Sequence, residues 1–356
     1  DGHLRYEKFA YPLYNVDGRI EVNEDVVRIT DFRGLSANSG VVRCEGTYRI
    51  PKPSPDPNLF RISDSGSGIE VPPQLALVFQ TTNIPMDDAL RSSLPESAQH
   101  TWDSLAPGGV LDEANVWVTQ QEHAGPLQID LTARQIYANQ INNRTLSLRP
   151  CSLPYRIDIS SGTVRYDGSK VYIDSLNGQH GATRLAADGF CVQGPTGRWD
   201  LTLNMKGGSR LNPDAELISA LPNEMREAMR RLQLRGPVSL RGQTKITLPD
   251  ADHIEPLIHW DIALQLEGNR IADVGPVHSL RGEISVVGSR DQQGIRAAGD
   301  VHIDSMHVDD LQITSIQGPF TVVDDVLKLG VRSNLASSHL AGSNMAPSPT
   351  PATRSI

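Results

Sequence analysis

Residues 87–109 read DDALRSSLPESAQHTWDSLAPGG, and residues 214–236 read DAELISALPNEMREAMRRLQLRG. The two stretches align without a gap at an offset of 127 residues, with a shared Leu-Pro pair in the middle and a glycine at the end. An alternating apolar pattern precedes both copies, at 75–79 and at 201–205. A recurring unit of strands plus one helix predicts a stacked architecture, in which neighbouring units bury one continuous apolar face.

A hairpin that opens on a glycine is a second repeated element. Gly18, Gly162 and Gly318 each begin this pattern, and the first two copies continue into the glycine-bearing strands EGTYRI (45–50) and ADGFCV (187–192). The spacing is unequal, which predicts insertions such as the proline-rich PKPSPDPN at 51–58. We therefore expect four parts: a partial first repeat (1–62), a repeat with a helix near 86–106 (63–200), a repeat with a helix near 213–234 and the start of the next hairpin (201–343), and a disordered tail (344–356).

Most of the chain alternates apolar and polar residues with period two, the pattern of strands with one dry and one wet face. In GRIEVNEDVVRIT (18–30), Ile20 and Val22 point to one side, while Arg19 and Glu21 point to the other. Short turns such as Asp167-Gly168 separate many strands and favour hairpins. A hydrophobic fraction of 38%, with Gly 30 and Pro 24, also favours a turn-rich, mainly β protein.

The two helical stretches carry end signals and an internal break. Asp214 is a candidate N-cap, and Gly236 stands where a left-handed residue would follow the helix. Pro95 and Pro222 fall in mid-pattern, so each helix is expected to kink or restart there. Each stretch has an apolar stripe that predicts packing on a sheet: Leu90, Leu94, Ala98, Trp102 and Leu105 in the first, and Leu217, Leu221, Met225, Met229 and Leu232 in the second.

Charge and cysteine content exclude several classes of function. The net charge is −9 and no basic cluster occurs, so a nucleic-acid footprint is absent. Cys44, Cys151 and Cys191 form no CxxC pair, and Cys44 and Cys191 occupy alternating apolar positions, where a thiol acts as a small hydrophobe. One disulfide in an oxidising compartment stays possible. The chain shows no signal peptide and no apolar run near 18 residues, and it opens at Asp1 in strand-like sequence, so we expect a piece of a longer protein.

No nucleotide-binding loop, nucleophile elbow, zinc-protease motif or dinucleotide fingerprint occurs, so we expect no enzyme and no cofactor. The best metal-like pattern is GDVHIDSMHVDD (299–310), in which Asp300, His302 and Asp304 share one strand face. Two carboxylates and an imidazole at this spacing suit a divalent cation, and a metal-dependent enzyme is the alternative they leave open. An alternating strand places polar residues on its wet face in any case, so we favour a solvated face.

The order of these elements resembles a known family. A glycine hairpin, a glycine-bearing strand, an alternating leucine strand and a helix of the form D-x-x-L-x-x-L-P follow one another, most clearly in IPMDDALRSSLP (84–95), LNPDAELISALP (211–222) and SSGTVRYDGSKVYIDSLNGQHGATRLAADG (160–189). This order of elements is similar to that of the AsmA-like proteins of bacterial envelopes, the superfamily that includes TamB and YhdP. The resemblance covers roughly residues 12–343 and rests on the pattern, without an invariant motif.

The resemblance implies an elongated, curved antiparallel sheet with an open, taco-like groove. Such a protein would be periplasmic, anchored to the inner membrane by a segment absent from this chain, and would conduct phospholipid between the two membranes in outer-membrane biogenesis. Inner- and outer-membrane envelope proteins would be its partners. The candidate groove-lining residues are aliphatic and lie on alternating strand faces: Ile20, Val22, Val42, Leu201, Leu203, Leu264, Leu266 and Ile303.

A closed β-repeat, acting as a structural or adhesion scaffold of the cell envelope without lipid cargo, is the main alternative. Alternating apolar residues would serve a closed core equally well, so the sequence leaves the choice open. The dry face is mainly Val, Ile, Leu and Ala, and aromatics make up 5% of the chain. That composition suits a hydrocarbon-lined trough better than a sugar-binding cleft.

Overall fold

The computed structural model describes residues 2–6, 9–38, 40–51, 73–122, 125–136, 145–151, 153–194, 197–221, 223–249, 255–272, 277–323 and 326–331. The expected tail at 344–356 and nearly all of the proline-rich insertion lie outside these residues, as does the expected boundary between the first two repeats.

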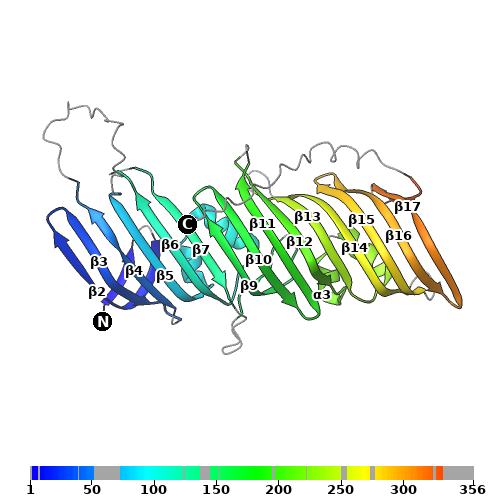
Figure 1. Cartoon of the computed structure of the whole chain (residues 1–356), viewed down its shortest axis with the longest axis horizontal. Coiled ribbons are helices and arrows are strands. Elements are labelled where there is room, and N and C mark those ends of the chain that lie inside the picture. Colours follow the sequence, from blue (N-terminus) through cyan, green and yellow to red (C-terminus); the bar gives the residue numbers. More distant parts are fainter. Residues whose placement is uncertain are drawn as a thin grey trace, which may run out of the picture.

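Within the described residues eighteen strands form one open antiparallel sheet, and they pair in chain order except that β7 pairs with β9. The short β8 pairs with β9 beside the β7–β9 pair. In Figure 1 the strands lie side by side along the long axis, from β2 at one end to β17 at the other. The strands are β1 (Gly2–Tyr6), β2 (Phe9–Asn23), β3 (Val26–Leu35), β4 (Val41–Arg49), β5 (Leu75–Pro85), β6 (Val110–Gln120), β7 (Gln128–Gln135), β8 (Ser147–Leu148), β9 (Ile157–Tyr166), β10 (Lys170–His180), β11 (Thr183–Gln193), β12 (Trp199–Leu211), β13 (Val238–Thr247), β14 (Leu257–Ile271), β15 (Val277–Asp291), β16 (Gly294–Val308), β17 (Leu311–Val323) and β18 (Val326–Leu329).

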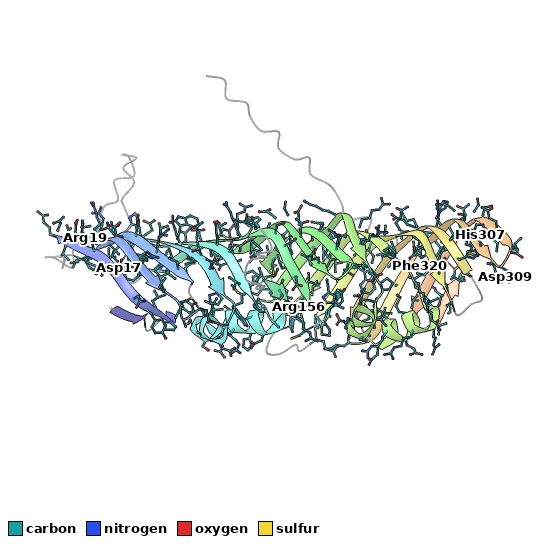
Figure 2. All side chains as sticks on the ribbon, turned by 90° about the horizontal axis from the view of Figure 1, so that it is seen from below. Asp17, Arg19, Arg156, His307, Asp309 and Phe320 are labelled. Carbon is teal, nitrogen blue, oxygen red and sulfur yellow. The ribbon has the colours of Figure 1, made fainter. Side chains whose placement is uncertain are left out.

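The protein is mainly β, and its sheet is elongated and curved, which confirms the predicted fold class. Figure 2 shows the curve from a second direction, with Phe320 inside it and Arg19 on its outer side. The described helices are α1 (Asp88–Ser93), α2 (Glu96–Leu105), α3 (Ala215–Ala220) and α4 (Asn223–Leu232). They lie behind the strands in Figure 1. One pair of helices follows β5 and the other follows β12, so the two copies occupy equivalent places in the chain.

Each helical stretch is broken in two at its Leu-Pro pair, as the sequence predicts. In the first copy α1 ends at Ser93 and α2 begins at Glu96, directly after Pro95. Proline lacks the N–H that a continuous helix would need and clashes with the preceding turn. Its fixed φ nevertheless suits the start of a new helix. The repeated Leu-Pro pair therefore produces a repeated helix–break–helix element.

Both copies begin with the same side-chain cap. The N–H of Leu90 donates to Asp87 Oδ1 at 3.0 Å, and the N–H of Leu217 donates to Asp214 Oδ1 at 2.8 Å. The predicted cap at Asp214 is confirmed, and each bond satisfies one N–H that a helix start leaves without an intrahelical partner.

The expectation for Gly236 was wrong. The left-handed residue directly after α4 is Gln233, at φ 45°, whereas Gly236, at φ 98°, comes three residues later. The same difference occurs in the first copy, where Ala106 caps α2 with φ 42°. These helices therefore end without a glycine, and Gly236 lies two residues before β13.

The apolar stripe of the second copy is covered only over α3. Leu217 and Ala220 are buried against Tyr155, together with Leu211 at the end of β12. Met225 and Leu232 on α4 are 43% and 41% exposed. The predicted packing on the sheet therefore holds for the first helix of the pair, and α4 leaves part of its apolar side to solvent.

Mid-strand glycines allow neighbouring strands to approach closely. A Cβ on Gly242 would lie 2.2 Å from the carbonyl oxygen of Asp261, and one on Gly282 would lie 2.2 Å from that of His302. Both glycines have positive φ, at 126° and 151°. Such a close backbone approach bends the sheet and leaves no room for a side chain.

Bulges are a second source of curvature. Asn15, Asp31, Ser175 and Ser279 adopt left-handed φ values between 50° and 55° inside strands. Each coincides with a shift in strand register. An extra residue at such a point bends the strand and increases its twist. Repetition of these bulges in β2, β3, β10 and β15 carries the curve along the molecule.

Candidate functional site

One face of the sheet is apolar from end to end, and we call it the apolar face. Strand registers connect a single row of residues on this face through fourteen strands. Its members are small or apolar apart from two threonines. The row consists of Val42, Thr81, Ala114, Ala133, Val164, Ile173, Gly189, Leu203, Thr244, Trp260, Gly288, Ala297, Val322 and Leu327.

The row displaced by one residue lies on the opposite face, which we call the outer face. Its members are mostly polar or charged, with an aromatic pair in the middle. The row consists of Arg43, Gln80, Asn115, Thr132, Arg165, Tyr172, Phe190, Thr202, Lys245, His259, Ser289, Arg296 and Val323. The period-two pattern of the sequence is thus carried without interruption across the molecule.

The apolar face is only partly covered. Seventeen hydrophobic side chains are buried among the described residues. Ile20, Val22 and Leu327 on the apolar face are 67%, 61% and 59% exposed. Isolated exposed hydrophobic residues are common on protein surfaces, but a face that stays apolar over many strands marks an interaction site.

All eight predicted groove-lining residues lie on this one face, as strand register shows. Their exposure differs along the molecule. Ile20 and Val22 are exposed, and Leu266 and Ile303 are buried at 5% and 6% exposure. The other four are half-buried: Val42, Leu201, Leu203 and Leu264.

Leu266 and Ile303 belong to a packed cluster rather than to an open surface. They pack with Val238 and Leu280, and Leu234 from the segment after α4 packs against the same cluster. This cluster closes the apolar face where the α4 segment returns to the sheet. The face is therefore filled by the protein's own side chains at this cluster and left uncovered at Ile20 and Val22 on β2.

Ion pairs populate the outer face. Arg165 Nε lies 3.0 Å from Asp174 Oδ2, and Arg241 Nη2 lies 2.7 Å from Glu283 Oε2. Lys206 pairs with Asp188 and, with the backbone N–H of Ser175, lowers the pKa of the Asp188 carboxyl. Such exposed pairs contribute little to stability, but they keep this face well solvated.

Asp300, His302 and Asp304 lie on the outer face, and only two of them are in contact. His302 Nε2 lies 3.2 Å from Asp304 Oδ1, and both side chains are about 60% exposed (59% and 62%). Within the described ranges, no three or more His, Cys, Asp or Glu side chains gather as metal ligands would. Asp300, the third residue of the proposed metal alternative, takes no part in that contact.

All three cysteines are free. Cys44 and Cys191 occupy matching places on the apolar face, next to Phe79 and Leu201 across the ladder. Burial raises the pKa of each of these two thiols to about 11, so both are neutral at physiological pH. Cys151 is exposed.

A repeated buried tyrosine was not predicted from the sequence. Tyr11 and Tyr155 each stand seven residues before a hairpin glycine, Gly18 and Gly162. Tyr155 is 2% exposed, packs against Leu217 and meets the His180 ring edge-on at 4.6 Å between centroids. Burial raises the pKa of both phenols. The glycine offset of 144 residues was the signal that could have found this pair.

Comparison with protein-family models, with curated proteins and with solved structures finds no match to this chain. Among the described residues, no helix has the length and apolar character needed to cross a bilayer.

Proposed function

We propose that this protein binds phospholipid along its apolar face and conducts it without chemical change. The observation that carries the proposal is the uncharged row from Val42 to Leu327, small or apolar apart from two threonines, on a sheet that remains open. A soluble domain that buries its core needs no apolar face with exposed residues such as Ile20, Val22 and Leu327, whereas a lipid path does.

The dimensions of the row suit hydrocarbon. Strands lie about 4.8 Å apart, so thirteen steps extend the row for roughly 60 Å. One leaflet of a bilayer contributes about 15 Å of hydrocarbon. The row therefore offers room for several acyl chains placed end to end.

The energetics permit transfer. Each buried methylene contributes roughly 0.8 kcal/mol, which offsets its removal from a bilayer. The row contains no charged residue and is mostly small or aliphatic, so we expect the affinity for a chain to change little from step to step. A conduit needs this uniformity because a single tight site would trap the lipid.

We place the protein in the AsmA-like superfamily on the order of elements in its sequence, and in the periplasm between the two membranes. In this proposal a segment outside the chain anchors it to the inner membrane, and envelope proteins of both membranes are its partners. In this proposal the phosphate headgroup stays in water along the uncovered side of the apolar face. The lipid moves without a chemical step, so the protein acts without catalysis.

A scaffold without cargo is the second candidate, and the packed cluster around Leu266 and Ile303 favours it. There the chain seals its own apolar face. The two candidates differ in one property, which is whether hydrocarbon from outside enters the uncovered part of the face.

Replacement of Leu203 and Leu264 by aspartate tests the proposal. Both side chains are half-buried on the apolar face, so charged groups there would abolish lipid uptake. The matched control replaces their exposed outer-face neighbours, Asn204 and Gln265, by aspartate. Native mass spectrometry would detect phospholipid on the wild-type protein and on the control, but not on the leucine variant. Unchanged uptake by the leucine variant, or a lipid-free wild-type protein, would count against the conduit and for the scaffold.

A further inference from the structure

A cleft of about 510 Å³ opens on the outer face, away from the apolar row. It lies where β11, β12 and β13 reach the segment that leads into and out of the α3–α4 pair. Arg184, Arg210, Ser239 and Glu267 contribute its polar side chains, with Asn212 and Pro237 at the strand ends. Its volume falls within the range of small-molecule sites.

A bulge with two extra residues on β12 borders the cleft. β11 and β12 pair at Ala187–Met205 and next at Arg184–Arg210, so β12 has extra residues in between. Ser209 is fully buried, and its side chain takes the place of the missing backbone hydrogen bonds between the two strands. Its Oγ accepts from the N–H of Ala186 at 2.9 Å and donates to the carbonyl oxygen of Ala186 at 3.0 Å. Gly207 and Gly208 are displaced outward, and a Cβ on either would touch nothing within 4 Å.

The cleft places two like charges opposite each other. Arg184 and Arg210 are direct cross-strand partners, an arrangement that is unfavourable without a counter-ion. Glu267 compensates only in part: its carboxylate lies 3.9 Å from Arg210 Nη2 and accepts from Ser239 Oγ at 3.4 Å. Arg184 has no carboxylate within ion-pair distance among the described residues, whereas Arg241 on the same face has Glu283 at 2.7 Å.

We propose that Arg184 and Arg210 bind a phosphate group in this cleft. A carboxylate has two oxygens, which one guanidinium fork already occupies, whereas a phosphate offers enough oxygens for two forks. Ser239 and Asn212 line the same space and provide further donors. Glu267 is the one anionic side chain of the lining, and it opposes the ligand. The site does not depend on the proposed conduit, because it lies on the opposite face.

Calorimetric titration of the full chain with inorganic phosphate tests this site, with a chloride titration at equal ionic strength as the reference. We expect saturable phosphate binding that Arg184→Gln and Arg210→Gln each weaken by about tenfold or more. Glu267→Gln should strengthen it several-fold, because it removes the opposing charge. Arg241→Gln, an outer-face arginine that already has a partner, should leave it unchanged. The gain expected from Glu267→Gln keeps the test decisive even if an arginine variant folds poorly.

Two further arms identify the source of the phosphate. If the protein binds sn-glycerol 3-phosphate, if Arg184→Gln weakens that binding, and if the protein does not float with phosphatidylglycerol vesicles, the ligand is a free phosphate ester. If the protein floats with the vesicles, if Arg184→Gln abolishes this flotation, and if the Leu203 and Leu264 aspartate variant retains it, the ligand is a lipid headgroup. Equal phosphate affinity in wild type and both arginine variants, or a chloride response as large as that to phosphate, would overturn the proposal.

Discussion

Glycine occupies mid-strand positions on the apolar face where two backbones lie too close for a side chain. A Cβ on Gly46 would lie 2.1 Å from the carbonyl oxygen of Ala76, and one on Gly189 would lie 2.2 Å from that of Thr202. These are the two glycine-bearing strands that the sequence repeats. The reason for the glycines is the sharp approach of the neighbouring strand, and it becomes visible only in the folded sheet.

Gly242→Ala should therefore destabilise the protein by about 2 kcal/mol or more, because alanine strains a positive φ and overpacks against Asp261. Gly318→Ala is the matched control on the same face, since a Cβ there meets nothing within 4 Å and β17 holds it without a left-handed φ. Urea denaturation would measure both. Equal losses in the two variants would contradict the crowding argument.

The two buried thiols predict a pH effect. Their pKa in the folded state is about 11, against 9.0 for an ordinary thiol, so between these values the unfolded chain loses protons that the folded chain keeps. Stability should fall as the pH rises from 9 to 11. A double variant, Cys44→Ala with Cys191→Ala, should lose less stability over that range, as denaturation midpoints at both ends would show.

At pH 8, iodoacetamide should label the exposed Cys151 before either buried thiol.

At the scale of elements, the helix pairs show how a short repeat is specified. Each pair starts with an aspartate cap, breaks at a Leu-Pro pair and ends on a left-handed residue other than glycine. In the second pair, α3 packs against Tyr155 through Leu217 and Ala220. Cap and break are local features and could be predicted; the packing partner lies about sixty residues away in sequence and could not.

Asp214→Ala should cost about 1 kcal/mol, because the N–H of Leu217 would lose its acceptor at the start of α3. Glu227→Ala is a suitable control, since among the described residues its side chain makes only an exposed pair with Arg231 on α4, and its loss should change stability by less than about 0.5 kcal/mol. Thermal unfolding followed by circular dichroism would compare them. A control loss as large as that of Asp214→Ala would refute the capping role.

At the scale of the whole molecule, the sheet behaves as a ribbon with two chemically different faces. Each strand contributes one step, and the antiparallel registers keep the faces aligned from β2 to β18. A slip of one residue in any pair would transfer charged side chains into the apolar row. The bulges at Asn15, Asp31, Ser175 and Ser279 do not break this alignment, because each places its extra residue in a left-handed conformation and the next residue returns to its face.

Photo-crosslinking to lipid should follow this alternation. A benzoylphenylalanine at Val42, Leu203 or Leu327 would capture phospholipid in the proposed conduit. The same group at the next residue of each strand, Arg43, Asn204 or Lys328, would face the outer side and capture little. Mass analysis of the adducts would measure the ratio at three places about 30 Å apart along the row. Equal capture at neighbouring positions would mean that lipid contacts the chain without regard to its faces.

The sequence by itself determined the two-faced strands, the capped and broken helices, and the repeat that relates them, because periodicity, caps and proline act within a few residues. It also placed each of the eight candidate residues on the apolar side of its own strand, since alternation acts within a strand, and the register of the sheet joins these sides into one face. Only the tertiary structure decided which of them are open, because exposure depends on which distant segment returns to the sheet. Leu234 after α4 packs against the cluster that buries Leu266 and Ile303, while nothing described packs closely enough over Ile20 and Val22 to bury them. The Arg184–Arg210 cleft likewise borders a register shift between strands, which no single strand encodes.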